Sequence, residues 1–130
     1  NDSIMVSNLV APLLSRIEQS DSNEIKVVID RQGFALYFSR EPIPSWKKGG
    51  KDIPMLKQVC IIPFRRDFLI KFNQLAPTPL EIAESIDMLR VLEHGYKVKT
   101  VFSNSQTYSV DTLEDLEKVE KSWKTQNSHA

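Results

Sequence analysis

The sequence contains few of the residues that build disulfide scaffolds and structural metal centres. Its 130 residues include one cysteine, Cys60, and two histidines that lie far apart. One cysteine cannot form an internal disulfide, and the histidines offer no zinc-ligand spacing. We therefore expect packing and hydrogen bonds to hold the fold, with Cys60 as a small apolar residue in a buried strand.

The sequence also lacks an excess of charge and long apolar runs. Seventeen lysines and arginines balance 17 aspartates and glutamates, so no net field favours a nucleic-acid backbone or an anionic membrane. No run approaches the roughly 18 apolar residues of a membrane span, and the first residues lack a secretory signal pattern. These absences predict a cytoplasmic protein that binds neither nucleic acid nor membrane.

Glycine is scarce, with four residues in no spacing typical of a phosphate-binding loop. No serine or cysteine has a neighbouring histidine that would form a nucleophile and base pair. What remains, 41% hydrophobic and 26% charged residues, is typical of one globular domain or part of a larger one.

The first half of the sequence favours strands. Apolar and β-branched residues predict strands over 4–10, 24–29 and 34–39, and the turn from Asp30 to Gly33 joins the last two into a hairpin. Prolines and a glycine pair make 41–57 an irregular excursion. A short apolar strand over 59–62 and a helix over 65–72 are expected to follow.

The second half carries two helix starts. Thr78, Pro79 and Glu81 are typical of a capped first turn, and we expect one helix from there to Gly95. Its apolar stripe, in the core or at a subunit interface, consists of Ile82, Ile86, Leu89 and Leu92. A strand over 96–102 follows. A second cap at Thr112 opens a last helix, with an inner face of Leu113, Leu116, Val119 and Trp123.

Strands that alternate with helices predict an α/β fold with a mixed sheet and flanking helices. The hairpin and the excursion argue against a simple repeated βαβ array. Three stretches then carry a resemblance, in order and spacing: residues 23–40 with the sequence ALYFSR followed by Pro42-Ile43-Pro44, residues 77–95 beginning PTPLE, and residues 110–116 with the sequence VDTLEDL. Together they resemble the carboxy-terminal half of the 3-deoxy-manno-octulosonate cytidylyltransferases, or CMP-Kdo synthetases, over nearly all 130 residues.

The resemblance implies a single partial domain over 1–130, with the carboxy-terminal part of a nucleotide-diphospho-sugar transferase-like fold. It implies Mg²⁺-dependent transfer of CMP from CTP to the anomeric hydroxyl of 3-deoxy-manno-octulosonate (Kdo), with release of pyrophosphate, for lipopolysaccharide biosynthesis. It further implies a homodimer, with the 41–57 excursion near the contact. The family's CTP-binding motifs lie upstream of the matching region, so we expect this chain alone to be inactive and assign it no catalytic residue.

The resemblance assigns Asp111 as a Mg²⁺ ligand, because the aspartate of the VDT motif has that role in the family. The alternative is that Asp111 merely caps the last helix. Thr112 is the better cap, with Asp115 three residues later, so we favour the metal role.

The same resemblance places four residues at the family's sugar-binding positions: Gln58, Ile62, Asp87 and Met88. Gln58 and Asp87 can hydrogen-bond a sugar hydroxyl, whereas Ile62 and Met88 depart from the family's polar residues. Arg40 is a candidate for binding a carboxylate or phosphate, or else forms an exposed salt bridge. The alternative for the other four positions is simple packing.

Two rival functions remain open. The chain can act as a non-catalytic dimerising or sugar-binding module. It can also belong to a cytidylyltransferase for another acidic sugar, because a site that loses polar partners discriminates differently among hydroxylated substrates.

Overall fold

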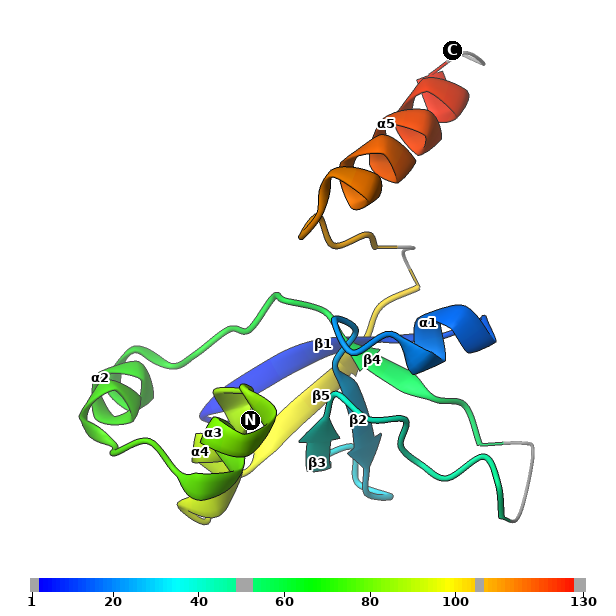
Figure 1. The fold of residues 1–130 in the computed structure, drawn as a ribbon. Coiled ribbons are helices and arrows are strands. Elements are labelled where there is room, and N and C mark those ends of the chain that lie inside the picture. Colours follow the sequence, from blue (N-terminus) through cyan, green and yellow to red (C-terminus); the bar gives the residue numbers. More distant parts are fainter. Residues whose placement is uncertain (1–2, 49–52, 105–106, 128–130) are drawn as a thin grey trace.

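The computed structural model describes residues 3–48, 53–104 and 107–127, so Gly49 and Gly50 of the predicted excursion lie outside the described residues. A five-stranded mixed sheet forms the centre, and the last helix extends away from it (Figure 1). The elements in chain order are β1 (Val6–Pro12), α1 (Arg16–Ser20), β2 (Lys26–Ile29), β3 (Ala35–Ser39), β4 (Leu56–Gln58), α2 (Arg66–Gln74), α3 (Pro79–Glu84), α4 (Met88–Glu93), β5 (Val98–Phe102) and α5 (Leu113–Asn127). The expected α/β class with a mixed sheet is confirmed.

The strands lie in the order β3-β2-β4-β1-β5, in which β1 and β5 are parallel and the other neighbours antiparallel. The predicted hairpin is confirmed as β2 and β3. Gly33 has a φ of +79°, a conformation that costs glycine little, and the Asp30 carboxylate accepts hydrogen bonds from the amides of Gln32 and Phe34.

The strand expected over 59–62 is wrong by three residues, because β4 covers Leu56–Gln58. Its polar side chains are buried with partners: Gln58 donates a hydrogen bond to Asn8, and Lys57 forms an ion pair with Glu24. Those partners lie far away in the sequence and offset the cost of burial. The chain then leaves the strand, and Cys60 is exposed rather than buried.

The single helix expected from residue 78 to Gly95 is also wrong. It is divided into α3 and α4 by Ser85, which has a left-handed conformation with φ of 54°. The carbonyl groups of Glu84 and Ser85 accept hydrogen bonds from the Arg40 guanidinium instead of from the next helical turn. The apolar stripe is therefore split: Ile86 and Leu89 are buried, whereas Ile82 is 71% exposed.

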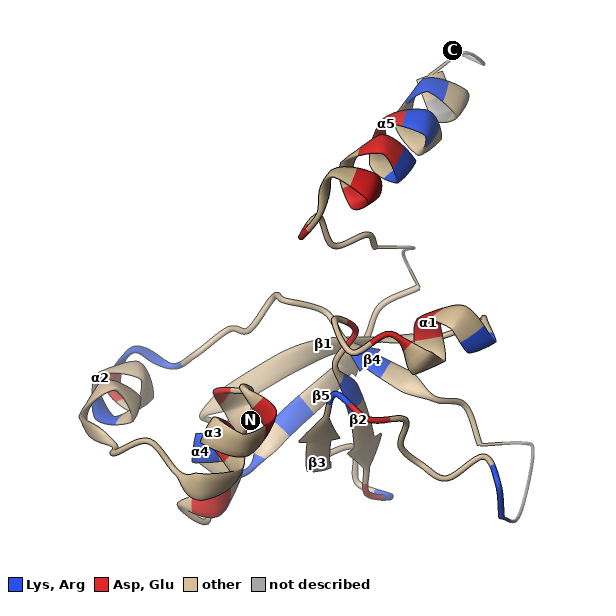
Figure 2. Cartoon of the chain, viewed as in Figure 1, with Lys and Arg blue, Asp and Glu red and all other residues tan. Residues whose placement is uncertain are grey.

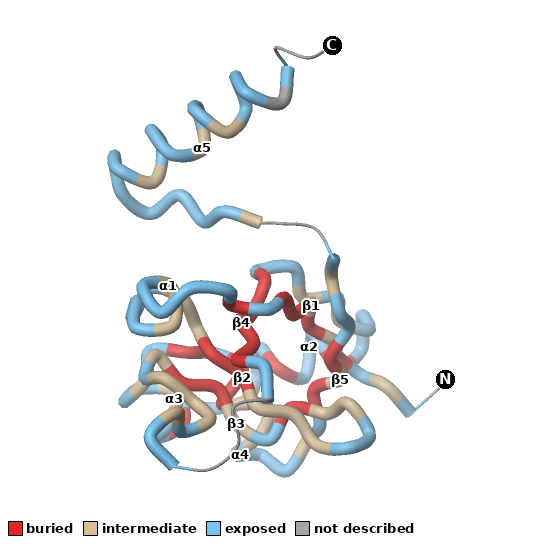
Figure 3. Tube along the Cα trace, turned by 90° about the vertical axis from the view of Figure 1, so that its right-hand side faces the viewer, coloured by how far each residue is buried: buried red, intermediate tan, exposed pale blue. Residues whose placement is uncertain are grey.

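The core lies between the sheet and the helices α2 and α4. It consists of Val6, Val10, Val27, Ala35, Phe38, Leu56, Phe68, Phe72, Ile86, Met88, Leu89, Val91 and Val98. Figure 3 shows this buried centre in the sheet layer and in α4. An aromatic cluster attaches α2, with ring centroids of Phe68 and Tyr96 5.0 Å apart and those of Phe64 and Phe72 5.4 Å apart.

Helix α5 stands away from the sheet in both views (Figures 1 and 3). Its expected inner face is wrong for this chain: Leu113 is 81% and Trp123 68% exposed. Acidic residues lie at its start and Lys124 in its last turn (Figure 2), an arrangement that suits the helix dipole. None of the helices within the described ranges combines the length and the apolar character needed to cross a bilayer.

Candidate functional site

Two cavities share a wall at the end of β4. The first, of about 620 Å³, is lined by Asn23, Ile25, Arg40, Lys57, Gln58, Val59, Cys60, Ile61 and residues 107–111. The second, of about 600 Å³, is lined by Ile25, Gln58, Cys60, Ile62, Glu81, Ile82, Ser85, Ile86 and Asp87. Both are of the size that holds a small ligand. Ile25, Gln58 and Cys60 border both cavities.

Gln58 has a fixed orientation at this shared wall. Its Nε2 donates to Asn8 Oδ1 over 2.5 Å, and Asn8 Nδ2 donates in turn to the carbonyls of Leu9 and Val59. Within the described residues, Gln58 Oε1 accepts no hydrogen bond from the protein. That oxygen is a free acceptor for a hydroxyl group at the cavities.

The other three predicted sugar-binding positions divide between the cavity and the core. Asp87 and Ile62 line the second cavity. Asp87 directly precedes α4, and its side chain forms no cap hydrogen bond. Met88 is 1% exposed and belongs to the hydrophobic core. The burial of Met88 favours the packing alternative for that position.

Arg40 lines the first cavity, but much of its hydrogen-bonding capacity is used inside the protein. Nε donates to Glu84 O, Nη1 to Ser22 O and Nη2 to Ser85 O, over 2.8 to 2.9 Å. A guanidinium has five N–H groups, so two remain for a ligand. These carbonyl contacts replace the exposed salt bridge that the sequence left open.

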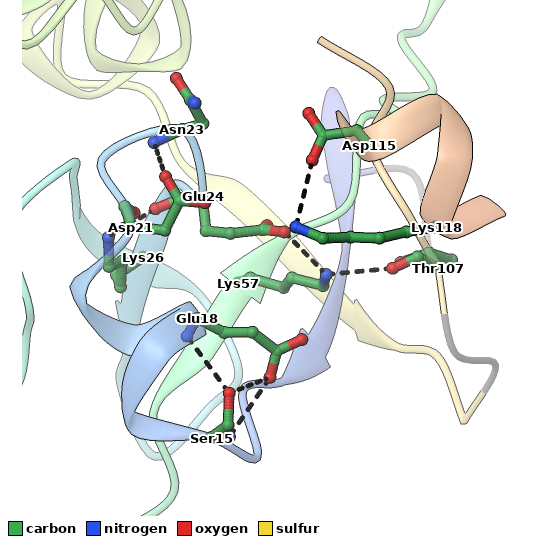
Figure 4. A network of polar contacts seen from close by, with 10 residues as sticks. All are labelled: Ser15, Glu18, Asp21, Asn23, Glu24, Lys26, Lys57, Thr107, Asp115 and Lys118. Carbon is green, nitrogen blue, oxygen red and sulfur yellow. Dashed lines mark hydrogen bonds and ion pairs between the residues drawn. The ribbon is translucent and has the colours of Figure 1, made fainter. Parts of the chain in front are cut away.

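Lys57 is a residue of the site that the sequence did not single out. It is buried in β4, and its Nζ donates to Glu24 Oε1 over 3.2 Å and to Thr107 O over 3.1 Å (Figure 4). It thereby connects the sheet to the segment that leads to Asp111. The sequence carries a weak signal for this role, because a lysine after proline-rich excursion residues is equally typical of a solvated loop.

A second buried lysine supports the rim of the first cavity. Lys26 is fully buried, and its Nζ donates to the carbonyls of Asp21, Glu24 and Arg40 over 2.5 to 2.7 Å. Burial lowers the pKa of Lys26, and the nearby carboxylates of Asp21 and Glu24 counteract that effect. By binding these three carbonyls, Lys26 stabilises the turn that places Asn23 at the cavity.

Asp111 lies on the wall of the first cavity, and its neighbour forms the helix cap. Thr112 Oγ1 donates to Asp115 Oδ2 over 2.8 Å, and the Asp115 amide donates back to Thr112 Oγ1. In the part of the chain that the structure describes, the Asp111 carboxylate has no hydrogen bond or ion pair. This arrangement favours the metal role over the capping role.

The donor set fits one ligand of a Mg²⁺ ion rather than a complete site. Hard carboxylate oxygens suit Mg²⁺, which is commonly held by one or two carboxylates together with substrate phosphates and water. Among the described residues, no group of three or more His, Cys, Asp or Glu side chains gathers in a metal-binding arrangement. Asp111 therefore fits as a single contributor to a shared coordination shell.

Comparison with known proteins identifies the class to which this fold belongs. The structure of CMP:2-keto-3-deoxy-manno-octonic acid synthetase complexed with CTP matches with a TM-score of 0.86 at 32% sequence identity, over 97% of this chain and 52% of that chain. The fold is therefore that of the nucleotide-diphospho-sugar transferases. A family model described as cytidylyltransferase matches residues 1–106, and the chain belongs to that family.

Two relatives illustrate the similarity. The 3-deoxy-manno-octulosonate cytidylyltransferase of Geotalea uraniireducens is 39% identical over 129 residues, covering 92% of this chain and 51% of the relative. That of Synechococcus elongatus is 43% identical over 109 residues, covering 84% of this chain and 44% of the relative. The chain is thus a homologue of the CMP-Kdo synthetases and spans about half the length of the curated relatives it matches.

Proposed function

We propose that this chain forms the acceptor side of a cytidylyltransferase that transfers CMP from CTP to Kdo, in the cytoplasm, for lipopolysaccharide biosynthesis. The observation that carries the proposal is that Gln58, Asp87 and Asp111, distant in the sequence, line two cavities with a common wall. Membership of the cytidylyltransferase family supports the reaction class. The structural relative complexed with CTP supports the donor nucleotide.

Gln58 and Asp87 are the residues we propose for the acceptor sugar. The free Oε1 of Gln58 and the Asp87 carboxylate accept hydrogen bonds from sugar hydroxyls. The two unused N–H groups of Arg40 suit the carboxylate of a sugar acid or a phosphate at the first cavity. Ile62 supplies an apolar wall, and Met88 supports the site by packing beneath it.

In the proposed reaction, the anomeric hydroxyl oxygen of the acceptor attacks the α-phosphorus of CTP. A new P–O bond forms, and the bond from that phosphorus to the oxygen bridging to the β-phosphate breaks. Pyrophosphate leaves, and the hydroxyl proton passes to solvent water. Mg²⁺ supplies charge neutralisation at the phosphate oxygens when it is bound, and Asp111 is our proposed ligand for it. We place the triphosphate pocket and the remaining Mg²⁺ ligands outside these 130 residues, and we therefore expect the chain alone to be inactive.

We also propose a homodimer with the 41–57 excursion near the contact. Within this segment, the ring of Trp46 packs under the Arg16 guanidinium at 4.4 Å from the ring centroid. This cation–π interaction connects the excursion to α1. It would give the proposed dimer interface a defined shape.

A second candidate keeps the reaction and changes the acceptor to another sugar acid, such as a nonulosonate. The apolar Ile62 at the second cavity supports it, because an apolar wall cannot recognise a hydroxyl at that position. The two candidates differ in substrate and not in chemistry.

The deciding experiment incubates the complete polypeptide that carries this sequence with CTP, MgCl₂ and a panel of sugar acids that includes Kdo, and follows pyrophosphate release. Release with Kdo supports the first proposal, and release with another acid alone supports the second. No release with any acid would overturn both and favour a non-catalytic module. Turnover by the isolated 130 residues would contradict the placement of the CTP pocket outside them.

A further inference from the structure

The break between α3 and α4 determines where Asp87 lies. Ser85 has φ of 54° and ψ of 51°, and the Ser85 and Ile86 amides both donate to the Glu81 carbonyl. The chain then starts α4 at Met88, whose side chain enters the core while Asp87 faces the second cavity. In one continuous helix Asp87 would occupy a different position relative to the sheet.

The Glu84 carboxylate attaches this break to the end of β3. Oε1 accepts hydrogen bonds from Ser39 Oγ over 2.8 Å and Tyr37 Oη over 3.2 Å, and Oε2 accepts one from the Arg40 amide over 3.0 Å. Burial by itself would raise the pKa of Glu84, but these hydrogen bonds and the Arg40 charge lower it overall. The carboxylate is therefore ionised at neutral pH and holds three donors from one strand end.

The Arg40 side chain completes the attachment from the other direction. It donates to the carbonyls of Glu84 and Ser85, which in an uninterrupted helix would accept the amides four residues later. The Arg40 carbonyl is itself held by the buried Lys26 over 2.6 Å. The helix break is thus held by a strand end more than 40 residues earlier in the sequence.

We propose that Arg40 and Glu84 are positioning residues for the acceptor. They stabilise the break between α3 and α4 and so place Asp87 at the wall of the second cavity. The inference rests on the proposed function, in which Asp87 binds the acceptor sugar. Glu84 lines neither cavity, so it acts through Asp87 and not by contact with a ligand. Substitution of Glu84 is also easier to interpret than substitution of Arg40, because Arg40 borders the first cavity and could contact a ligand directly.

The test is Glu84→Gln in the complete polypeptide, assayed by pyrophosphate release. The amide keeps the size of the side chain and loses the charge that holds three donors. We expect the KM for the acceptor to rise about tenfold or more, because small displacements of a binding group have large effects, while the KM for CTP stays within about twofold. An unchanged acceptor KM in a folded variant, or an equal rise of both KM values, would overturn the proposal.

Two further variants separate positioning from a general loss of stability. Glu93→Gln is the matched control, because Glu93 Oε2 also joins the two helices by accepting the Leu80 amide but borders neither cavity. It should leave the acceptor KM unchanged. Ser85→Gly in the Glu84→Gln background should recover most of the acceptor affinity, because glycine adopts the left-handed conformation without the steric cost that serine has. A failure of this rescue counts against the mechanism.

Alternative readouts cover the remaining outcomes. If Glu84→Gln does not fold, Tyr37→Phe removes one donor to the same carboxylate, and an acceptor KM unchanged by that variant overturns the proposal. If the unmodified protein transfers CMP to no sugar acid, the proposed function fails and amide hydrogen exchange decides the positioning. Faster exchange over residues 85–89 in Glu84→Gln, with α2 unchanged, then supports the held break, and unchanged exchange refutes it.

Discussion

Gln58 Nε2 donates to Asn8 Oδ1 over 2.5 Å, and the fully buried Asn8 thereby supports a residue of the wall that the two cavities share. Asn8 joins β1 to β4 and to the residue that follows β4, because its amide also donates to Val59 O over 2.8 Å. The orientation of a proposed sugar-binding residue is thus decided by an asparagine 50 residues earlier.

Asn8→Ala tests this support. The change leaves the buried Gln58 amide without its partner, whereas the Val59 carbonyl still accepts the Ile61 amide. The free energy of unfolding should therefore fall by about 1–3 kcal/mol. Urea unfolding of the complete polypeptide measures it. Asn73→Ala, at an exposed position on α2, should stay within about 0.5 kcal/mol of the unmodified protein; equal losses in the two variants would contradict the account.

Phe68→Ala tests the aromatic attachment of α2. Phe68 is 4% exposed and packs against Tyr96 and Phe64, so truncation leaves a cavity and should cost about 3–5 kcal/mol in unfolding free energy. Leu69→Ala, one position along the same helix and 42% exposed, is the matched control and should cost less than about 1 kcal/mol. If thermal or urea unfolding shows the same stability for Phe68→Ala as for Leu69→Ala, α2 does not pack into the core.

Asp111→Asn tests the proposed metal ligand. Since Thr112 and Asp115 form the cap between themselves, the change should leave the unfolding midpoint unaltered. It should lower the rate of pyrophosphate release by about 10- to 100-fold, with a raised Mg²⁺ requirement. Glu114→Gln, in the first turn of α5, is the control and should keep normal kinetics. Normal rates with Asp111→Asn would return that residue to a structural role.

The acid side of the stability profile follows from Glu81 and Glu84. The Arg90 guanidinium, hydrogen-bonded to both Glu81 oxygens, lowers the pKa of Glu81 against the opposing effect of burial. The pKa of Glu84 is lowered as well, since its hydrogen bonds outweigh burial. A group with a lowered pKa binds fewer protons in the folded state, so its stabilisation is complete above the ordinary glutamate pKa of about 4.3 and is lost as the pH falls below it.

Urea midpoints measured between pH 7 and pH 3 check this direction. The unmodified protein should lose stability below about pH 4. The variant Arg90→Met removes the group that lowers the pKa of Glu81, so its midpoint should be lower at pH 7 and depend less on pH in acid. A pH dependence identical to that of the unmodified protein would contradict the role of the ion pair.

Several elements could be predicted from neighbouring residues alone. Asp30 and Gly33 determine the turn of the hairpin, because the carboxylate binds amides two and four residues ahead and glycine accepts the positive φ. Thr112 and Asp115 form the cap of α5 through contacts within one turn. The motifs that carry the family resemblance likewise lie within short stretches. For the turn and the cap local geometry was sufficient, because the groups that interact are close in the sequence.

The position of β4, the division between α3 and α4 and the exposure of Cys60 depend on partners that no local pattern specifies. Lys57 and Gln58 can be buried in β4 because Glu24, in the turn before β2, and Asn8, in β1, bind their polar groups. The cap at Thr78 and the apolar residues after it favour one long helix. The Arg40 guanidinium, 45 residues before Ser85, instead donates hydrogen bonds to the carbonyls of Glu84 and Ser85 that would continue this helix. Local propensity therefore decided which kinds of element form, whereas hydrogen bonds between distant residues decided where two of them end and which side chains line the cavities.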